Sequence, residues 1–245
     1  MVNMKPSTFT LVCTAIGEVL ISGAVLLLMF VGWKLGWQDV TYATHQSDAA
    51  AAQSEAWIAA ASEDVTPHSA EFGDPTVGEA PQAGTAFAVL YVPRYGPDYR
   101  RTIAEGFGAE VLNSFDLGIG HYPGTQMPGD TGNFAIAGHR SAYGGAMHLI
   151  DQLVPGDPII VQTADGWYTY RFRSERIISP DKIDVIWPVP GAEGAEPTER
   201  LITLTTCNPL YSSRERIAAV GVLESWRPLS AGPPGVIAAQ VAAQN

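Results

Sequence analysis

The chain contains little cysteine and little positive charge. Cys13 and Cys207 are its two cysteines, and 14 Lys and Arg face 25 Asp and Glu, which gives a net charge of −11. Nucleic acid is disfavoured as a partner, because phosphate binding needs clustered basic side chains. The sequence has no CxxC pair and no Cys/His cluster at zinc spacing. The two thiols lie in very different contexts, so we expect no disulfide between them.

Glycine and proline, in contrast, are abundant, with 25 and 18 residues, and 46% of the chain is hydrophobic. From Thr85 onward, short runs rich in β-branched and aromatic residues, such as Phe87–Pro93 and Trp167–Ile178, are separated by Gly/Pro turns. Short strands joined by such turns are typical of an antiparallel or mixed β-barrel. We therefore predict a mainly β domain.

A long apolar run lies near the N-terminus, from Phe9 to Trp33. As a helix rising 1.5 Å per residue, it exceeds the ~30 Å of a hydrocarbon core. The alternative is a cleaved signal peptide, whose apolar region usually spans only ~7–15 residues. Here the run leads into Trp33–Trp37, an aromatic and basic belt typical of a membrane interface. We predict an uncleaved transmembrane helix over residues 9–33, despite the carboxylate of Glu18, after a cytoplasmic segment of residues 1–8.

Two segments outside the β domain have the composition of flexible chain. Residues 38–84 carry acidic side chains and no Lys or Arg, and they are rich in Ala, Ser, Thr, Gln and Pro. Such sequence buries too little surface to offset chain entropy. We predict a flexible acidic stalk over 34–84, a catalytic domain over 85–227 and a flexible tail over 228–245. Ala49–Ser62 has helical propensity, which leaves open a transient helix or one that docks on the domain.

The side chains that could carry chemistry begin with Cys207. It ends an apolar run, and Arg214 and Arg216 precede the next run, so it is a candidate activated nucleophile. His139 follows an apolar strand and a glycine, which lets its ring project at a strand end. Taken singly, a buried Cys or a lone His is more often structural. Spacing alone does not bring these residues together; the other histidines of the domain are His121 and His148.

Three motifs resemble those of sortases. Thr203–Cys207 reads TLTTC, and Arg216 follows nine positions after the cysteine, as in the sortase signature. Asn133–Arg140, NFAIAGHR, is similar to the sortase histidine motif. Gly120–Thr125, GHYPGT, together with Asn208-Pro209, is most similar to class E sortases of high-GC Gram-positive bacteria. The resemblance covers roughly residues 85–225.

The resemblance implies a sortase-type eight-stranded β-barrel with short helices, anchored in the cell membrane with its catalytic domain outside. It also implies a cysteine transpeptidase without a cofactor. Such an enzyme cleaves an LAxTG- or LPxTG-like sorting signal between Thr and Gly through a thioacyl intermediate. The implied partners are secreted proteins with a C-terminal sorting signal and an amine of the cell-wall precursor, from lipid II or a peptidoglycan stem or cross-bridge.

The same resemblance implies roles for five residues. Cys207 is the nucleophile, His139 exchanges protons with the leaving and incoming amines, and Arg216 stabilises the oxyanion or holds the substrate backbone. The nine-residue step selects Arg216 over Arg214. Thr206 assists through its hydroxyl or shapes the strand end. Tyr122 either reads the start of the signal, with LAxTG preferred over LPxTG, or packs under the Gly/Pro loop.

Some sortases bind calcium near this loop, but between residues 121 and 133 only Asp130 carries a carboxylate, so we predict no metal. Two other functions remain open from the residues. One is a cysteine peptidase that hydrolyses without transfer, and the other is a non-catalytic extracellular β-domain that binds wall polymer. L,D-transpeptidases also use Cys and His, but they usually have Ser and Gly before the cysteine, where this chain has Thr205-Thr206.

Overall fold

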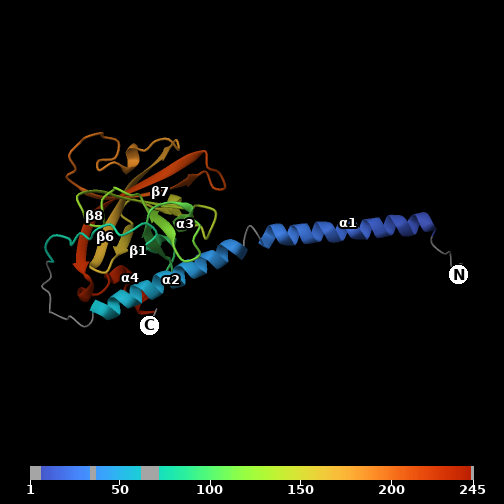
Figure 1. Ribbon diagram of the computed structural model, residues 1–245, viewed down its shortest axis with the longest axis horizontal. Coiled ribbons are helices and arrows are strands. Elements are labelled where there is room, and N and C mark those ends of the chain that lie inside the picture. Colours follow the sequence, from blue (N-terminus) through green and yellow to red (C-terminus); the bar gives the residue numbers. More distant parts are fainter. Residues whose placement is uncertain (1–6, 34–36, 62–71, 244–245) are drawn as a thin grey trace.

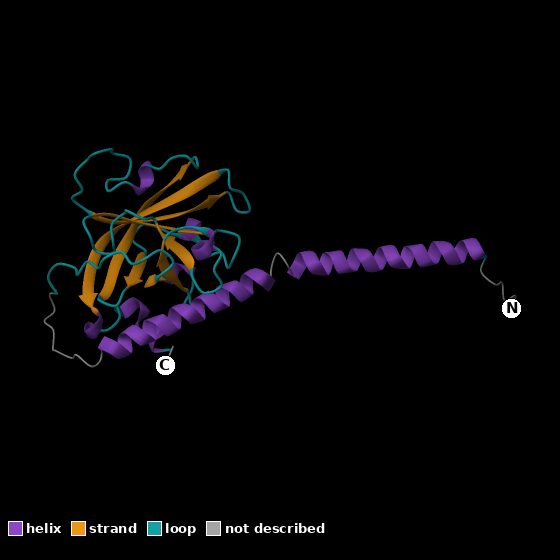
Figure 2. Ribbon diagram, viewed as in Figure 1, coloured by secondary structure: helices purple, strands orange, loops and turns teal. Residues whose placement is uncertain are grey.

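The structure is a computed structural model that describes residues 7–33, 37–61 and 72–243 of the chain. A β-barrel forms its body, and two long helices precede the barrel in sequence (Figures 1 and 2). Helix α1, Thr8–Gly32, extends away from the barrel, whereas α2, Gln38–Ala61, lies along it (Figure 1).

Eight strands close into a barrel in the order β1-β2-β3-β4-β7-β8-β6-β5. The pairs β2/β3 and β4/β7 are parallel, and the other neighbours are antiparallel. The prediction of a mainly β, eight-stranded barrel with short helices is therefore confirmed. The strands are β1 (Ala86–Tyr91), β2 (Arg100–Glu105), β3 (Gly118–His121), β4 (Gly132–Gly138), β5 (Pro158–Gln162), β6 (Gly166–Ile178), β7 (Arg200–Asn208) and β8 (Glu215–Pro228). The shorter helices are η2 (Pro93–Tyr95), α3 (Ala109–Leu112), η3 (Ile150–Gln152), η4 (Asp184–Ile186), η5 (Leu229–Ala231) and α4 (Gly235–Ala242).

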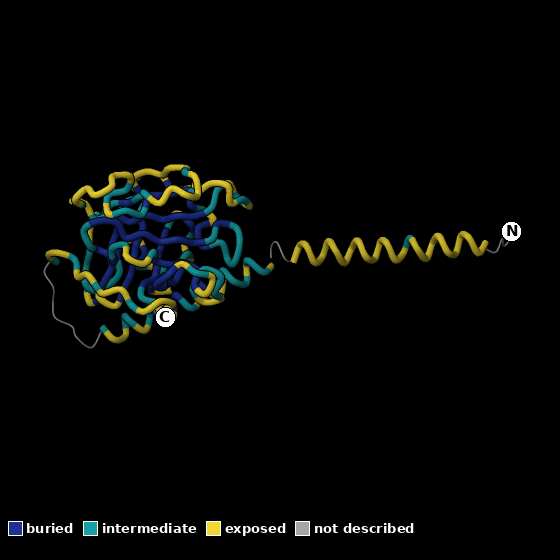
Figure 3. Tube along the Cα trace, turned by 45° about the horizontal axis from the view of Figure 1, so that its top comes forward, coloured by how far each residue is buried: buried dark blue, intermediate teal, exposed yellow. Residues whose placement is uncertain are grey.

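Apolar side chains fill the barrel interior. Leu90, Ile136 and Ile202 are fully buried there, on β1, β4 and β7, and Phe134 and Tyr170 add aromatic volume. Figure 3 shows the buried segments gathered in the middle of the barrel. An eight-stranded barrel is just wide enough for side chains to fill. The filled interior leaves the barrel rim and the outer face as places for a functional site.

The apolar helix α1 exposes nearly all of its side chains and contains no buried residue (Figure 3). An 18-residue window within it has a mean hydropathy of 2.3, and by length and composition the helix is able to cross a membrane. So large an exposed apolar surface is typical of a segment that lies in lipid. The helix fits the transmembrane segment predicted over residues 9–33.

A helix occupies much of the segment predicted as a flexible stalk. α2 buries Ala50, Ala51 and Ser54 against the barrel, and Arg100 Nε donates to the Ser47 carbonyl at 3.0 Å. The prediction of a flexible stalk therefore does not hold for residues 37–61. The low hydrophobicity of this segment did not predict a packed helix. Its small side chains let the helix approach the barrel closely enough for polar contacts. Within the predicted stalk, residues 34–36 and 62–71 lie outside the described residues.

Gln46 is a buried polar residue of α2 that contacts two other segments of the chain. Its Nε2 donates to the carbonyls of Ser114, at 2.9 Å, and Tyr143, at 3.0 Å. Gly118 and Gly144 both have positive φ, and a Cβ at either position would lie within 2.8 Å of the Gln46 side chain. Glycine therefore makes room for this side chain at the start of β3 and in the loop after β4.

The predicted flexible tail, 228–245, also contains packed structure. Leu229 of η5 is buried, and so are Ile237 and Val241 of α4. They join one apolar cluster with Ala50 of α2 and Trp167 of β6. The apolar side chains of η5 and α4 are stabilised by packing against α2 and the barrel. Residues 228–243 are therefore not a free tail. Residues 244–245 lie outside the described part.

Candidate active site

The parallel pairing of β4 and β7 determines where Cys207 lies. Ala137 is opposite Thr205 in this ladder, and extending the register by two residues brings His139, just past the end of β4, level with Cys207. The Thr206 hydroxyl donates to the Gly138 carbonyl at 2.7 Å, which ties the two strand ends together. Cys207 is a free, half-buried thiol. Sequence motifs 68 positions apart thus meet at one edge of the barrel.

Arg216 approaches Cys207 from the other side. It is the Cα partner of Cys207 in the antiparallel β7/β8 ladder. Its Nη1 donates to the carbonyls of Ser213 and Glu215, both at 2.9 Å, so the guanidinium is folded towards its own turn. Arg214 is exposed and precedes the first residue of β8. The ladder, like the nine-residue step, pairs Arg216 rather than Arg214 with the thiol.

His139 is half-buried and held by two neighbours. Its Nε2 donates to Asn113 Oδ1 at 2.8 Å, and the Tyr143 ring lies 5.2 Å from its own ring, centroid to centroid. With the proton on Nε2, Nδ1 keeps its lone pair and can accept a proton. Desolvation lowers the pKa of His139 below the usual histidine value, and the negative charge of Asp39 partly opposes this shift. His139 is therefore suited to act as a neutral base near pH 7.

Arg140 connects the ends of β4 and β7 next to the site. It is buried, and it donates to Asn208 Oδ1 and, through Nη2 at 2.7 Å, to Asp151. Asn208 directly follows Cys207, and Arg140 directly follows His139. The Arg140 side chain therefore links the segment that carries Cys207 to the segment that carries His139. This contact fixes the backbone that carries the thiol and the imidazole.

Tyr122 lies on the outer side of β4 and β7. Thr205 Oγ1 donates to the Ile136 carbonyl at 3.1 Å, so at 2.9 Å it accepts from the Tyr122 hydroxyl. The Tyr122 ring contacts the exposed Phe107, with ring centroids 4.7 Å apart. Tyr122 thus bonds to β7 two residues before Cys207, and its ring is partly open to solvent.

The other two histidines of the domain make structural contacts. His121 is fully buried; its Nδ1 contacts the Glu105 carboxylate and its Nε2 contacts Thr125 Oγ1 at 2.8 Å. His148 Nδ1 contacts the Arg140 carbonyl at 2.9 Å. Within the described residues, no group of three or more His, Cys, Asp or Glu side chains is placed to hold a metal ion.

Sequence reasoning missed three residues that position the site, namely Asn113, Arg140 and Gln46. Arg140 lies inside the histidine motif, and its position next to His139 was the one available signal. Asn113 and Gln46 belong to no recognised motif. Their roles depend on loops that the fold brings together, so spacing in the sequence does not reveal them.

Comparisons with known proteins agree with this geometry. A model of the sortase domain matches residues 90–224. Sortase SrtE1 of Streptomyces coelicolor is 35% identical over 240 residues, 95% of this chain; the match covers 63% of SrtE1, less than two thirds of its length. A crystal structure of sortase E1 from Streptomyces coelicolor, with a tripeptide in its active site, is 38% identical. It has a TM-score of 0.58 and covers 64% of this chain and 99% of its own.

The SrtA sortase from Actinomyces oris gives a similar result, with 37% identity, a TM-score of 0.63, and coverage of 67% of this chain and 94% of its own. The family match spans more than half of the sequence and includes the strands that bring Cys207, His139 and Arg216 together. The chain therefore belongs to the sortase family, with class E sortases among its relatives.

Proposed function

We propose that the protein is a membrane-anchored cysteine transpeptidase. It cleaves an LAxTG- or LPxTG-like sorting signal between Thr and Gly, and it joins the new carboxyl end to an amine of the cell-wall precursor. The observation that supports this proposal is the strand register: Arg216 is the cross-strand partner of Cys207, and the β4/β7 register, extended by two residues, brings His139 level with Cys207. A cysteine with only a packing role would require neither a half-buried base nor a cation as its neighbours.

The first half of the reaction forms the thioester. His139 takes the thiol proton on Nδ1, and the Cys207 thiolate attacks the Thr carbonyl carbon of the signal. The imidazolium then gives that proton to the departing Gly nitrogen, and the C–N bond breaks. The hydrogen bond from His139 Nε2 to Asn113 supports this sequence, because it leaves Nδ1 as the nitrogen that receives and returns the proton.

Arg216 stabilises the negative charge that forms on the carbonyl oxygen during attack. A guanidinium has five N–H donors, and Arg216 uses Nη1 for its hydrogen bonds to its own turn. A fixed cation near a developing oxyanion contributes several kcal/mol in comparable sites, of order 2.7–4 for one donor. The position opposite Cys207 in the β-ladder supports this role.

The second half of the reaction consumes the thioester. A free amine attacks the thioester carbon, His139 accepts the proton that the amine loses, and the C–S bond breaks. The imidazolium then reprotonates the departing thiolate, which restores the starting enzyme. A neutral imidazole with a lowered pKa is suited to this step, because it is unprotonated when the amine arrives.

Tyr122 is our candidate for reading the start of the signal. Its hydroxyl bonds to Thr205, on the strand of the nucleophile, while its ring remains partly exposed. A bound peptide that follows β7 would cross this ring before it reaches Cys207. Preference for Ala over Pro at the second signal position would follow from the space that this ring leaves.

The membrane placement follows from α1. We propose that it anchors the enzyme as a single-pass segment, with the N-terminus in the cytoplasm and the barrel outside the cell. Sorting signals emerge on that outer side, so the catalytic domain would meet its substrates there.

The test uses the full chain in detergent with an LAxTG peptide. We expect a Cys207 thioester adduct by intact mass, cleavage between Thr and Gly, and a transfer product when an amine is added. Cys207→Ala and His139→Ala should each lower turnover at least ~10³-fold, whereas Cys13→Ala, which removes the other thiol, should leave it unchanged. Full activity in Cys207→Ala would refute the mechanism. Hydrolysis with no transfer product at any amine concentration would favour the peptidase alternative.

A further inference from the structure

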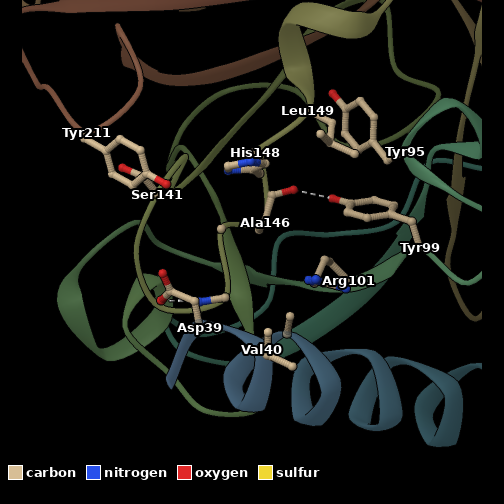
Figure 4. A pocket seen from close by; sticks show the side chains of 13 residues that line it. Asp39, Val40, Tyr95, Tyr99, Arg101, Ser141, Ala146, His148, Leu149 and Tyr211 are labelled. Carbon is tan, nitrogen blue, oxygen red and sulfur yellow. Dashed lines mark hydrogen bonds between the residues drawn. The ribbon is translucent and has the colours of Figure 1, made fainter. Parts of the chain in front are cut away.

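A cavity of about 350 Å³ lies beside the catalytic residues, between α2 and the loop that follows β4. Neither Cys207 nor His139 lines it, but Ser141, two residues after His139, and Tyr211, four residues after Cys207, both do. Figure 4 shows the start of α2 along one wall and the loop side chains across from it. The cavity therefore opens next to the site but is distinct from the strand edge that carries the thiol.

One wall of this cavity holds a buried cation. Arg101 of β2 is only 7% exposed, and its guanidinium lies over the Tyr99 ring, 5.0 Å from the centroid. Its Nη1 donates to the Arg100 carbonyl, while its buried Nε has no hydrogen-bond partner among the described residues. Within the described part of the chain, no carboxylate lies within ion-pair distance of Arg101. Burying an unpaired charge is costly, so a buried guanidinium of this kind is suited to an anionic group of a ligand.

A second wall holds the opposite charge. Asp39, near the start of α2, lines the cavity and is half-buried, and its Oδ1 is 3.5 Å from the Gly144 nitrogen. The negative charge of Asp39 also acts on His139, whose pKa it raises. The two charges thus come from different elements of the cavity wall. Asp39 belongs to α2 and acts electrostatically on His139, whereas Arg101 belongs to β2.

We propose that this cavity binds the amine substrate of the second half-reaction, and that this amine belongs to a carboxylate-bearing, amino-acid-like class. Its carboxylate pairs with Arg101, and its ammonium lies at Asp39, where it loses one proton to solvent and then attacks the thioester as the free amine, whose second proton goes to His139. This inference rests on the proposed function, because it needs a thioester that an amine can resolve. A small zwitterion complements one buried cation and one carboxylate in a cavity of this size.

The decisive probe is a matched pair of amines. Nα-acetyl-lysine and Nα-acetyl-lysinamide carry the same ε-amine and differ only in a carboxylate against a neutral carboxamide. Both are supplied together, at equal concentration, to the full chain with a saturating LAxTG peptide, and the two transfer products are quantified by mass spectrometry. We expect the carboxylate-bearing amine to be preferred by about tenfold, as for loss of a charged hydrogen-bond partner.

Two variants distinguish the walls, and a third is the control. Arg101→Gln should bring the product ratio close to one. Asp39→Asn should raise KM for both amines alike, because both carry the same ammonium. Arg176→Gln, at an exposed arginine of β6 that does not line the cavity, should keep the wild-type ratio. Arg101→Lys retains the charge and should keep part of the preference, which covers the case in which Arg101→Gln does not fold.

The outcomes separate the two proposals. If the wild-type ratio is near one, or if Arg101→Gln and Arg101→Lys keep the full preference, the assignment of the cavity is overturned while transfer itself stands. If the wild-type enzyme forms no thioester adduct with the LAxTG peptide, it is the proposed function that fails.

Discussion

At the scale of single residues, His139 is defined by its neighbours as much as by its own chemistry. Asn113 accepts the Nε2 proton, the Tyr143 ring packs beside the imidazole, and Arg140 fixes the following backbone. Such contacts determine which ring nitrogen is free and where it points. Residues that fix a tautomer act on the rate without touching the substrate.

Asn113→Ala should therefore lower kcat much more than it changes KM for the sorting peptide. We expect a loss of about 10²-fold, because the imidazole then samples the wrong tautomer and orientation. Asn113→Gln, a conservative amide with a longer reach, should restore part of the rate. Ser114→Ala, at the adjacent position, is the control. Equal effects of Asn113→Ala and Ser114→Ala would mean that the loop fold, and not the amide, matters.

The pH dependence of thioester formation should report the environment of His139. Desolvation lowers its pKa, so the base stays neutral to lower pH and the acid limb of kcat/KM should lie below the usual 6.5. Asp39 raises the pKa of His139, hence Asp39→Asn should move the acid limb to still lower pH. Asp48→Asn, on the exposed face of the same helix, should leave it in place. Acylation is followed without added amine, and an acid limb above 6.5 would contradict the assignment.

At the scale of elements, α2 and the catalytic loops form one unit. Gln46 bonds to Ser114, next to Asn113, and to Tyr143, which packs on His139. Tyr143 has a φ of 50°, an uncommon backbone conformation for a residue with a side chain. The bond from Gln46 to its carbonyl supports this conformation from the helix side.

Gly144→Ala should break this contact. A Cβ there would lie 2.8 Å from Gln46 Oε1 and 2.9 Å from the backbone nitrogen of Ala43. Gly84→Ala is the matched control, because Gly84 has a similar positive φ, 80° against 86°, but no atom within 4 Å of the added Cβ. Both changes cost about 1–2 kcal/mol for the left-handed backbone. Gly144→Ala should cost roughly 1–3 kcal/mol more from overpacking. Urea unfolding of the full chain measures the difference, and equal costs would mean that α2 does not press on this loop.

The sequence predicted the barrel, because several strands, such as β1 and β4, are short apolar runs beside Gly/Pro turns. It also predicted that Cys207 and His139 could share one site, although only through the family resemblance, since the register of β4 with β7 is a property of the closed barrel. The docking of α2 was not predictable in the same way. Its buried residues are alanine, serine and one glutamine, and the place of that glutamine depends on Gly118, at the start of β3, and on Gly144, in the loop after β4.

At the scale of the whole molecule, the predicted orientation can be tested with the two cysteines. Cys207 is half-buried at the barrel rim, and Cys13 lies within the apolar helix α1. A membrane-impermeant maleimide should therefore label intact cells that express the wild-type chain. Labelling should disappear in Cys207→Ala and persist in Cys13→Ala. Labelling of Cys207 only after the cells are permeabilised would place the barrel on the cytoplasmic side.

The docked position of α2 limits how far the enzyme can reach. A free stalk over residues 34–84 would behave as a coil with an end-to-end distance of roughly 35–45 Å. With α2 on the barrel, only residues 33–37 separate it from α1, and they span at most about 18 Å even when fully extended. The thiol would then search a thin layer above the bilayer, where the effective concentration of membrane-held substrates is high and that of proteins already released is low.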